Sequence, residues 1–202
     1  MRASKRLFPA LMLLVLIAPL RAQTPLRVAA AADLEPVLPP ILDQFQRATG
    51  LRSEATYQAS AMLATEIENG APFDLFLSAD LGYPKRLIDL GLADAAALRS
   101  LNLYDALKPR LVTAENTSQA AQFVDSANAD AGLISLTSAL TPRLTADGLY
   151  FVIPRNLYPP IEQGAVIVGS TKQRAAVHKL LDFLLSAPVQ AQLAKSGLTP
   201  VK

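Results

Sequence analysis

Three small polar residues stand where predicted strands give way to predicted helices: Asp33, Ser60 and Thr117. Each is a residue type that favours a helix N-terminus, where it satisfies amide groups that the helix leaves free. Together they indicate more than capping, because helix N-termini combine a positive dipole end with free N–H groups that bind anions. In an α/β sheet such N-termini gather at the carboxyl ends of the strands. The pattern therefore favours a site in which neutral donors hold an oxyanion.

The sequence offers little for catalysis or metal coordination. It contains no cysteine and one histidine, His178, which excludes a thiolate site or a multi-histidine metal site. His178 lies in an amphipathic segment, residues 172–185, and is interpreted as structural. Neither a G-x-S-x-G elbow nor a phosphate-binding glycine loop is present. A hydrolase that uses Asp33 and Asp74 as acid and base is kept as a third alternative, although carboxylates at such positions more often cap helices or make turns.

The composition is that of a folded, exported protein. Of the 202 residues, 51% are hydrophobic and 18% are charged, which excludes a disordered chain. Residues 1–22 combine a basic start with an apolar run too short to span a bilayer, the pattern of a cleavable signal peptide. They hold four basic and no acidic residues, so their removal would change the formal net charge from +2 to −2. We therefore expect a soluble product without a basic surface for nucleic acid.

Alternating strands and helices must position the polar residues. Apolar runs predict strands at residues 26–31, 51–57 and 74–78, and helical periodicity predicts helices at 34–48, 60–69 and 84–90. This order favours an α/β fold with a parallel sheet and helices on both faces. Pro39 and Pro40 imply that the first regular helix starts only after them. Further segments are predicted as strands at 110–113, 131–136 and 150–153, as an extended segment at 161–168, and as helices at 117–127, 172–185 and 188–195.

One segment resembles a known family. Residues 69–80, NGAPFDLFLSAD, are similar to the signature segment of periplasmic molybdate-binding proteins of ABC transporters. Shorter blocks resemble other parts of that family, so the resemblance covers nearly all of residues 26–197; these blocks are 28–34, 48–50, 114–120, 131–134, 158–161 and 183–186. The resemblance implies two α/β lobes joined by crossover strands. It also implies that hydroxyls and backbone amides hold molybdate or tungstate in the cleft between the lobes.

The resemblance assigns four candidate site residues. Ser60 matches a hydroxyl ligand that opens the second helix, and Thr117 matches a position that gives a backbone N–H. Asp33 falls where the family usually has Ser or Asn, and Ser135 aligns with a place where some members have a tyrosine hydroxyl. Asp33 and Ser60 would contact the oxygens of the oxyanion, without coordinating a metal directly.

Asp33 departs from the family pattern, and the change has an electrostatic consequence. A carboxylate beside a dianion is unfavourable, because two like charges raise each other's free energy. We predict that Asp33 gives its backbone N–H to the ligand and turns its carboxylate back to cap its own helix.

A second departure concerns the second lobe. After the equivalent of residues 100–102 the family has a crossover strand, more sheet and an Ala-Pro-Tyr-Gly turn that supplies another ligand. This sequence continues directly to residues 103–107, which resemble the segment after that turn. Several dozen residues of the second lobe are therefore expected to be missing. The remainder is small for a core of its own, and the loss of a crossover strand would loosen the hinge between the lobes.

We predict a two-lobed fold of the periplasmic-binding-protein type, with mixed or parallel sheets flanked by helices and a shortened second lobe. The expected parts are a signal peptide at 1–22, a first lobe of residues 23–100 plus 159–202, and a second lobe of residues 101–158. The predicted function is capture of molybdate or tungstate in the periplasm and its delivery to the membrane permease subunits of an ABC transporter. The protein would be a monomer, not an enzyme, and would use no cofactor. Two further alternatives stay open: a receptor for another oxyanion, and a remnant that binds no ligand.

Overall fold

A computed structural model describes residues 24–79, 97–158 and 161–201 of the chain. The signal peptide predicted at residues 1–22 and the helix predicted at 84–90 lie outside these ranges. Among the helices within them, none has the length and apolar character that a membrane crossing requires.

The fold is built on a four-stranded mixed sheet with the strand order β2-β1-β3-β4. The strands are β1 (Leu26–Ala31), β2 (Ser53–Gln58), β3 (Leu75–Ser78) and β4 (Gly164–Ile167). β1 pairs in parallel with β2 and β3, whereas β4 is antiparallel to β3. Val28 pairs with Ala55 on one side and with Leu75 on the other. The three parallel strands therefore end at one edge of the sheet, as the order of predicted strands and helices required.

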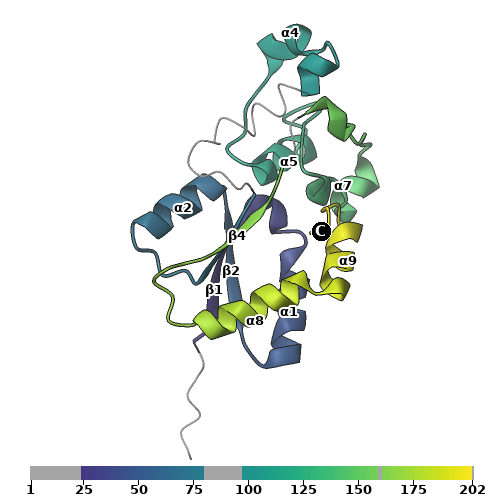
Figure 1. Cartoon of the computed structure of the whole chain (residues 1–202). Coiled ribbons are helices and arrows are strands. Elements are labelled where there is room, and N and C mark those ends of the chain that lie inside the picture. The colour runs from purple at the N-terminus through teal and green to yellow at the C-terminus, as the bar shows by residue number, and fades with distance from the viewer. Residues whose placement is uncertain (1–23, 80–96, 159–160, 202) are drawn as a thin grey trace, which may run out of the picture.

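Helices cover both faces of this sheet (Figure 1). α1 (Leu38–Thr49) and α8 (Arg174–Leu185) pack on one face, and α2 (Ser60–Glu68) packs on the other. Successive side chains of a strand point to opposite faces. Accordingly Val28 and Ala30 are buried with α1 and α8, while Ala29 is buried with α2. An apolar strand that is buried on both sides thus organises the whole core.

The start of α1 differs from the prediction. The helix begins at Leu38, so Pro39 and Pro40 lie within its first turn instead of before it. N–H groups of the first turn have no acceptor inside the helix, so proline loses no hydrogen bond there. The predicted end of the helix is confirmed: Gly50 adopts a left-handed conformation with φ +73°, and its N–H donates to the carbonyl of Gln46.

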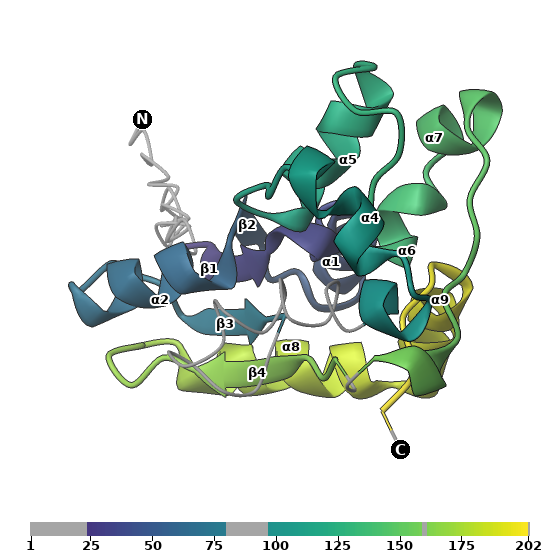
Figure 2. The ribbon, with the colours of Figure 1, turned by 90° about the horizontal axis from the view of Figure 1, so that it is seen from above.

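Residues 97–158 form short helices beyond the carboxyl edge of the sheet (Figure 1). Figure 2 shows α5, α6 and α7 beside one another in the view from above. Residues 97–100 are helical. The helices that follow are α4 (Tyr104–Leu107), α5 (Thr117–Asp125), α6 (Leu136–Ala139) and α7 (Pro142–Asp147), with 3-10 turns η2 (Lys108–Arg110) and η3 (Arg155–Leu157). The chain ends with α9 (Ala187–Lys195). The division into two lobes stays a prediction.

The strands predicted at residues 110–113, 131–136 and 150–153 are not formed. These segments are irregular apart from the residues that belong to η2 and α6. A strand requires a partner that pairs with its backbone N–H and C=O groups, and the described residues from 97 to 158 contain no strand that could be one. The side chains are correspondingly open to solvent, with Val112 78% and Phe151 76% exposed. An apolar sequence run was here a poor guide to structure.

Candidate functional site

The strand order creates a topological switch point at the carboxyl ends of β1 and β3. The connection from β1 to β2 runs through α1 on one face, and the connection from β2 to β3 runs through α2 on the other. Where connections diverge in this way, a crevice opens outside the carboxyl ends of the strands, and ligands of α/β sheets bind there. The candidate site lies at this edge.

A 3-10 turn, η1 (Ala32–Leu34), follows β1 directly and carries Asp33 to this edge. The Asp33 Oδ2 atom accepts a hydrogen bond of 2.5 Å from the Nε2 atom of Gln163, which comes just before β4. The Oδ1 atom is buried and accepts no hydrogen bond from the described residues. Burial raises the pKa of Asp33 from 3.8 to about 6, against the lowering effect of hydrogen bonds from its own N–H and from Gln163. The predicted cap of the following helix is not formed, because the carboxyl of Asp33 bonds to Gln163 and to its own N–H and not to an N–H of α1.

Ser60 opens α2 at the same edge, just past the end of β2. Its Oγ atom accepts a hydrogen bond of 3.0 Å from the N–H of Ala79, which directly follows β3. Since β1 lies between β2 and β3, this bond reaches across the end of β1. Ser60 and the turn that carries Asp33 therefore lie at the same switch point.

α5 directs its N-terminus toward η1. Asn116 caps the helix by accepting a hydrogen bond of 2.9 Å from the N–H of Gln119. Ser118 Oγ donates to the carbonyl of Ala32 at 3.1 Å. The N–H groups of Thr117 and Ser118 lie in the first turn of α5, where the helix offers them no carbonyl acceptor. They are therefore available to other partners. Thr117 is thus held beside η1 through its neighbour.

α6 and the residue before it also pack against η1. Thr137 Oγ1 donates to the carbonyl of Asp33 at 2.8 Å. Ser135 Oγ lies 2.9 Å from the hydroxyls of both Thr137 and Ser138. Thr137 and Ser138 are buried. We call Ser118, Ser135, Thr137 and Ser138 the hydroxyl cluster.

The structure brings three of the four predicted site residues to one turn. Asp33 lies on η1, Ser135 reaches it through Thr137, and Thr117 is adjacent to Ser118, which bonds to η1. Ser60 lies at the same edge but bonds to Ala79 instead. Sequence reasoning missed Ser118, Thr137 and Gln163. The two hydroxyl residues carried a signal, because each lies in a run of small polar residues at a helix start; no local pattern marks Gln163.

Asp74 lies at the amino ends of the parallel strands, whereas Asp33 lies at their carboxyl ends. Its carboxylate accepts hydrogen bonds from the N–H of Arg27 at 2.9 Å, from Thr171 Oγ1 at 2.5 Å and from Gln173 Nε2 at 3.2 Å. Asp74 precedes β3, whereas Asp33 follows β1, a strand of six residues. At about 3.3 Å per residue the two carboxyls are roughly 20 Å apart. The hydrolase alternative, which pairs them, is therefore wrong; Asp74 ties β1, β3 and the start of α8 together.

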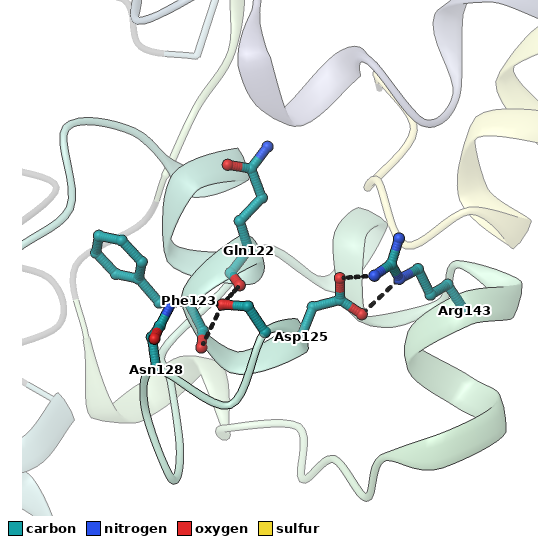
Figure 3. A network of polar contacts seen from close by, with 6 residues as sticks. Gln122, Phe123, Asp125, Asn128 and Arg143 are labelled. Atoms are coloured by element: carbon teal, nitrogen blue, oxygen red, sulfur yellow. Dashed lines mark hydrogen bonds and ion pairs between the residues drawn. The ribbon is translucent and has the colours of Figure 1, made fainter.

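The far end of α5 is fixed to α7 by an ion pair (Figure 3). Two nitrogens of Arg143 donate to the two carboxylate oxygens of Asp125 at 2.6 Å each. Ser126 Oγ donates to the carbonyl of Gln122 at 2.7 Å and accepts from Asn128 Nδ2 at 2.8 Å, which closes the end of the helix. These contacts hold α5 in the orientation that places Ser118 on η1.

A hollow of about 230 Å³ opens between α5, α6 and α7. Ser118 and Ser138 line it and also belong to the hydroxyl cluster, so the hollow adjoins the candidate site. A second hollow, of about 300 Å³, lies on the α2 side of β1 and β2. Glu54, Glu66 and Arg27 line it, so acidic residues outnumber basic ones, which disfavours an anion.

The donors gathered at the switch point are mainly neutral. Hydroxyls and the N–H groups of helix N-termini suit an oxyanion, because each offers a hydrogen to an oxygen acceptor without adding a counter-charge. In the described ranges no group of three or more His, Asp or Glu side chains could hold a metal ion. The arrangement is chemically one for holding a solute by hydrogen bonds.

Known proteins resemble the chain over most of its length. A model of the bacterial extracellular solute-binding protein family matches residues 26–97 and 95–199. The molybdate-binding protein ModA of Azotobacter vinelandii is 26% identical over 209 residues, which cover 78% of this chain and 83% of that protein. ModA of Rhodobacter capsulatus is 26% identical over 203 residues, covering 76% and 79%. The solved structure of the periplasmic molybdate-binding protein of Azotobacter vinelandii has a TM-score of 0.77 at 23% identity, over 88% of this chain and 100% of that chain.

These likenesses confirm the predicted fold class, a mixed sheet flanked by helices in a binding-protein fold. The alignment with the Azotobacter vinelandii protein runs over 209 positions but takes in only 78% of the 202 residues of this chain. That relative therefore carries residues that have no counterpart here. The two relatives are named as molybdate-binding proteins, and the family is one of extracellular solute-binding proteins, which are not enzymes. With both family matches together spanning most of its length, the chain belongs to the bacterial extracellular solute-binding proteins.

Proposed function

We propose that this solute-binding protein captures a tetrahedral oxyanion of the molybdate type and presents it to the permease subunits of its ABC transporter. One observation carries the proposal: Ser118 and Thr137, from two separate helices, both bond to carbonyls of η1. Their bonds gather hydroxyls and free helix N–H groups at the switch point of the sheet. Neutral donors fixed by the fold can replace the water around a dianion without reorganising when it binds.

The proposed ligands of the oxyanion are three groups at this edge: the hydroxyl of Ser60 and the backbone N–H groups of Thr117 and Ser118. The hydroxyl hydrogen of Ser135 goes to Thr137, whose own hydrogen goes to the carbonyl of Asp33, and the N–H of Asp33 bonds to its own carboxyl, so these two groups are not counted among the donors. Molybdate or tungstate is proposed because two relatives that are 26% identical are named as molybdate-binding proteins. With neutral donors the net charge of the anion matters less than its size, so the larger oxyanions should be preferred over sulfate.

Thermal unfolding of the mature protein with molybdate, tungstate, sulfate and phosphate tests the proposal. A solute that binds only the native state raises the melting temperature by mass action. We expect molybdate and tungstate to raise it at micromolar to millimolar concentrations, and sulfate to raise it less. Ser60→Ala should reduce the shift strongly, whereas Ser170→Ala, an exposed serine in a turn outside the site, should leave it unchanged.

The same titration separates the alternatives. A shift with phosphate alone would indicate a receptor for another oxyanion, and a flat response to all four anions would indicate the non-binding remnant. Equal shifts in the wild type and in Ser60→Ala would show that binding occurs elsewhere on the molecule.

A further inference from the structure

Asp33 places a carboxyl group in a site that otherwise consists of neutral donors. Its Oδ2 atom accepts from Gln163, but its Oδ1 atom is buried without a partner among the described residues. The buried Oε1 atom of Gln58, at the end of β2, is unpaired as well. An amide can rotate to present its N–H₂ group instead. A carboxylate cannot, so Oδ1 of Asp33 requires a hydrogen from something else.

A fully ionised oxyanion cannot supply that hydrogen. Carboxylate and oxyanion oxygens are both acceptors and both negatively charged, so an ionised Asp33 beside a dianion is unfavourable twice over. A single proton shared by the carboxyl and the oxyanion supplies the missing hydrogen bond and reduces the negative charge by one. The hydrogen bond and the total charge are the same whether the proton is assigned to the carboxyl or to the solute.

The surroundings of Asp33 favour that proton. η1 packs against β2, α5 and α6, and none of these four elements contains a lysine, arginine or histidine. The acidic and phenolic groups on these elements are Glu54, Tyr57 and Asp125, the last of which is paired with Arg143. Glu35 follows η1 and Glu162 precedes Gln163, whereas the nearest basic residue in sequence to these elements, Arg52, precedes β2 at the end of the strand away from η1. Burial is the largest cause of the raised pKa of Asp33. A bound dianion would raise it further, because a nearby negative charge disfavours the ionised carboxyl.

We propose that the protein binds its oxyanion together with one proton, which the Asp33 carboxyl and an oxygen of the solute share. This inference rests on the function proposed above. The solute class is then a tetrahedral oxyanion that carries a hydrogen when bound. An anion that is already singly protonated at neutral pH, such as hydrogen phosphate, brings the proton itself. Molybdate must take it from solution.

Isothermal titration calorimetry between pH 6 and pH 8.5 tests this, in two buffers that differ in ionisation enthalpy. For the wild type with molybdate we expect uptake of about one proton per anion, and an affinity that falls about tenfold per pH unit above the pKa of Asp33. Asp33→Asn, whose amide donates at every pH, should bind molybdate with no proton uptake and little pH dependence. Asp43→Asn, at an exposed position on α1, should behave as the wild type.

Phosphate provides the second arm of the experiment. It should bind the wild type with little proton uptake near neutral pH and should bind Asp33→Asn more weakly, because the acceptor for its hydrogen is lost. Wild-type binding of molybdate with constant affinity and no proton uptake would overturn the inference and leave the oxyanion function standing. If neither the wild type nor Asp33→Asn binds any oxyanion across this pH range, the proposed function itself is wrong, and this inference with it.

Discussion

At the scale of single residues, similar carboxyls have opposite roles because their partners differ. Asp74 receives three hydrogen bonds and joins two strands and a helix. Asp33 receives one from another side chain, keeps one oxygen unpaired, and has a raised pKa. Asp74 therefore stabilises the fold, whereas the burial of Asp33 lowers the stability of the protein when its carboxyl is ionised.

The cost at Asp33 predicts how stability depends on pH in the absence of any oxyanion. A pKa of about 6 in the folded protein, against 3.8 otherwise, means that the native state binds more protons than the unfolded state between these values. The stabilising contribution is complete below pH 3.8 and is lost as the pH rises through about 6. Asp33→Asn should therefore be more stable than the wild type at pH 7.5, by about 3 kcal/mol, and similar to it near pH 3.5.

Urea unfolding from pH 3.5 to pH 7.5 measures this difference. All other titrating groups are shared, so the two curves should diverge only between about pH 4 and pH 6. The exposed substitution Asp43→Asn serves as the control and should follow the wild type. Curves of Asp33→Asn and wild type that run parallel over the whole range would contradict the prediction.

At the scale of elements, the sheet followed from sequence because its information is local. β1 and β3 are short apolar runs, and the stripe of Leu38, Ile41, Leu42 and Phe45 marks the buried face of α1. Asp33 and Ser60 could be proposed because both stand at strand-to-helix junctions. Gln163 could not, because no local pattern marks it and its contact with Asp33 joins residues far apart in the chain. Thr137 lies in a polar run at a helix start, but its contact with Asp33 is equally long-range, so the run alone could not place it in the site. The strands predicted in residues 97–158 were wrong for a related reason. A strand forms only when another segment pairs with it, and its own sequence does not show whether that segment exists.

Two glycines with left-handed backbones make an element-scale prediction. Gly50 ends α1 with φ +73° and has open space where a side chain would be, whereas at Gly197, with φ +94°, a Cβ atom would lie 2.8 Å from Leu136 Cγ. Gly50→Ala should cost about 1 kcal/mol for its backbone alone. Gly197→Ala should cost roughly 1–3 kcal/mol more, because Leu136 must move.

The difference between the two substitutions extends to the site. Leu136 opens α6, whose Thr137 holds the carbonyl of Asp33. Gly197→Ala should therefore also weaken oxyanion binding, while Gly50→Ala should not. Thermal unfolding and titration of both variants measure these effects, and equal losses in stability and affinity would disprove the coupling.

At the scale of the whole molecule, apolar surface is distributed unevenly. The sheet and its helices bury large side chains completely, Phe45 among them, whereas residues 149–152 leave a run of apolar side chains open to solvent. A contiguous exposed run of this kind promotes association between molecules.

Substitution of Phe151, which is 76% exposed, tests whether this run promotes association. Phe151→Ser should leave the melting temperature within about 1 °C, because little apolar area is lost from the interior, and should lower light scattering at high protein concentration. Phe45→Ala, in the core, should instead cost about 3–5 kcal/mol. A large loss of stability in Phe151→Ser would show that this segment is packed in solution.

The position of β4 in the chain sets the order in which the molecule can be completed. β3 ends at Ser78, but its antiparallel neighbour begins only at Gly164, and α8, which closes one face of the core, follows still later. A polypeptide that emerges N-terminus first therefore exposes the free edge of β3 until the last part of the chain arrives. Pairing between such distant segments forms slowly. Until residues 164–167 are available, the free edge of β3 can pair with the same edge of a second copy of the chain.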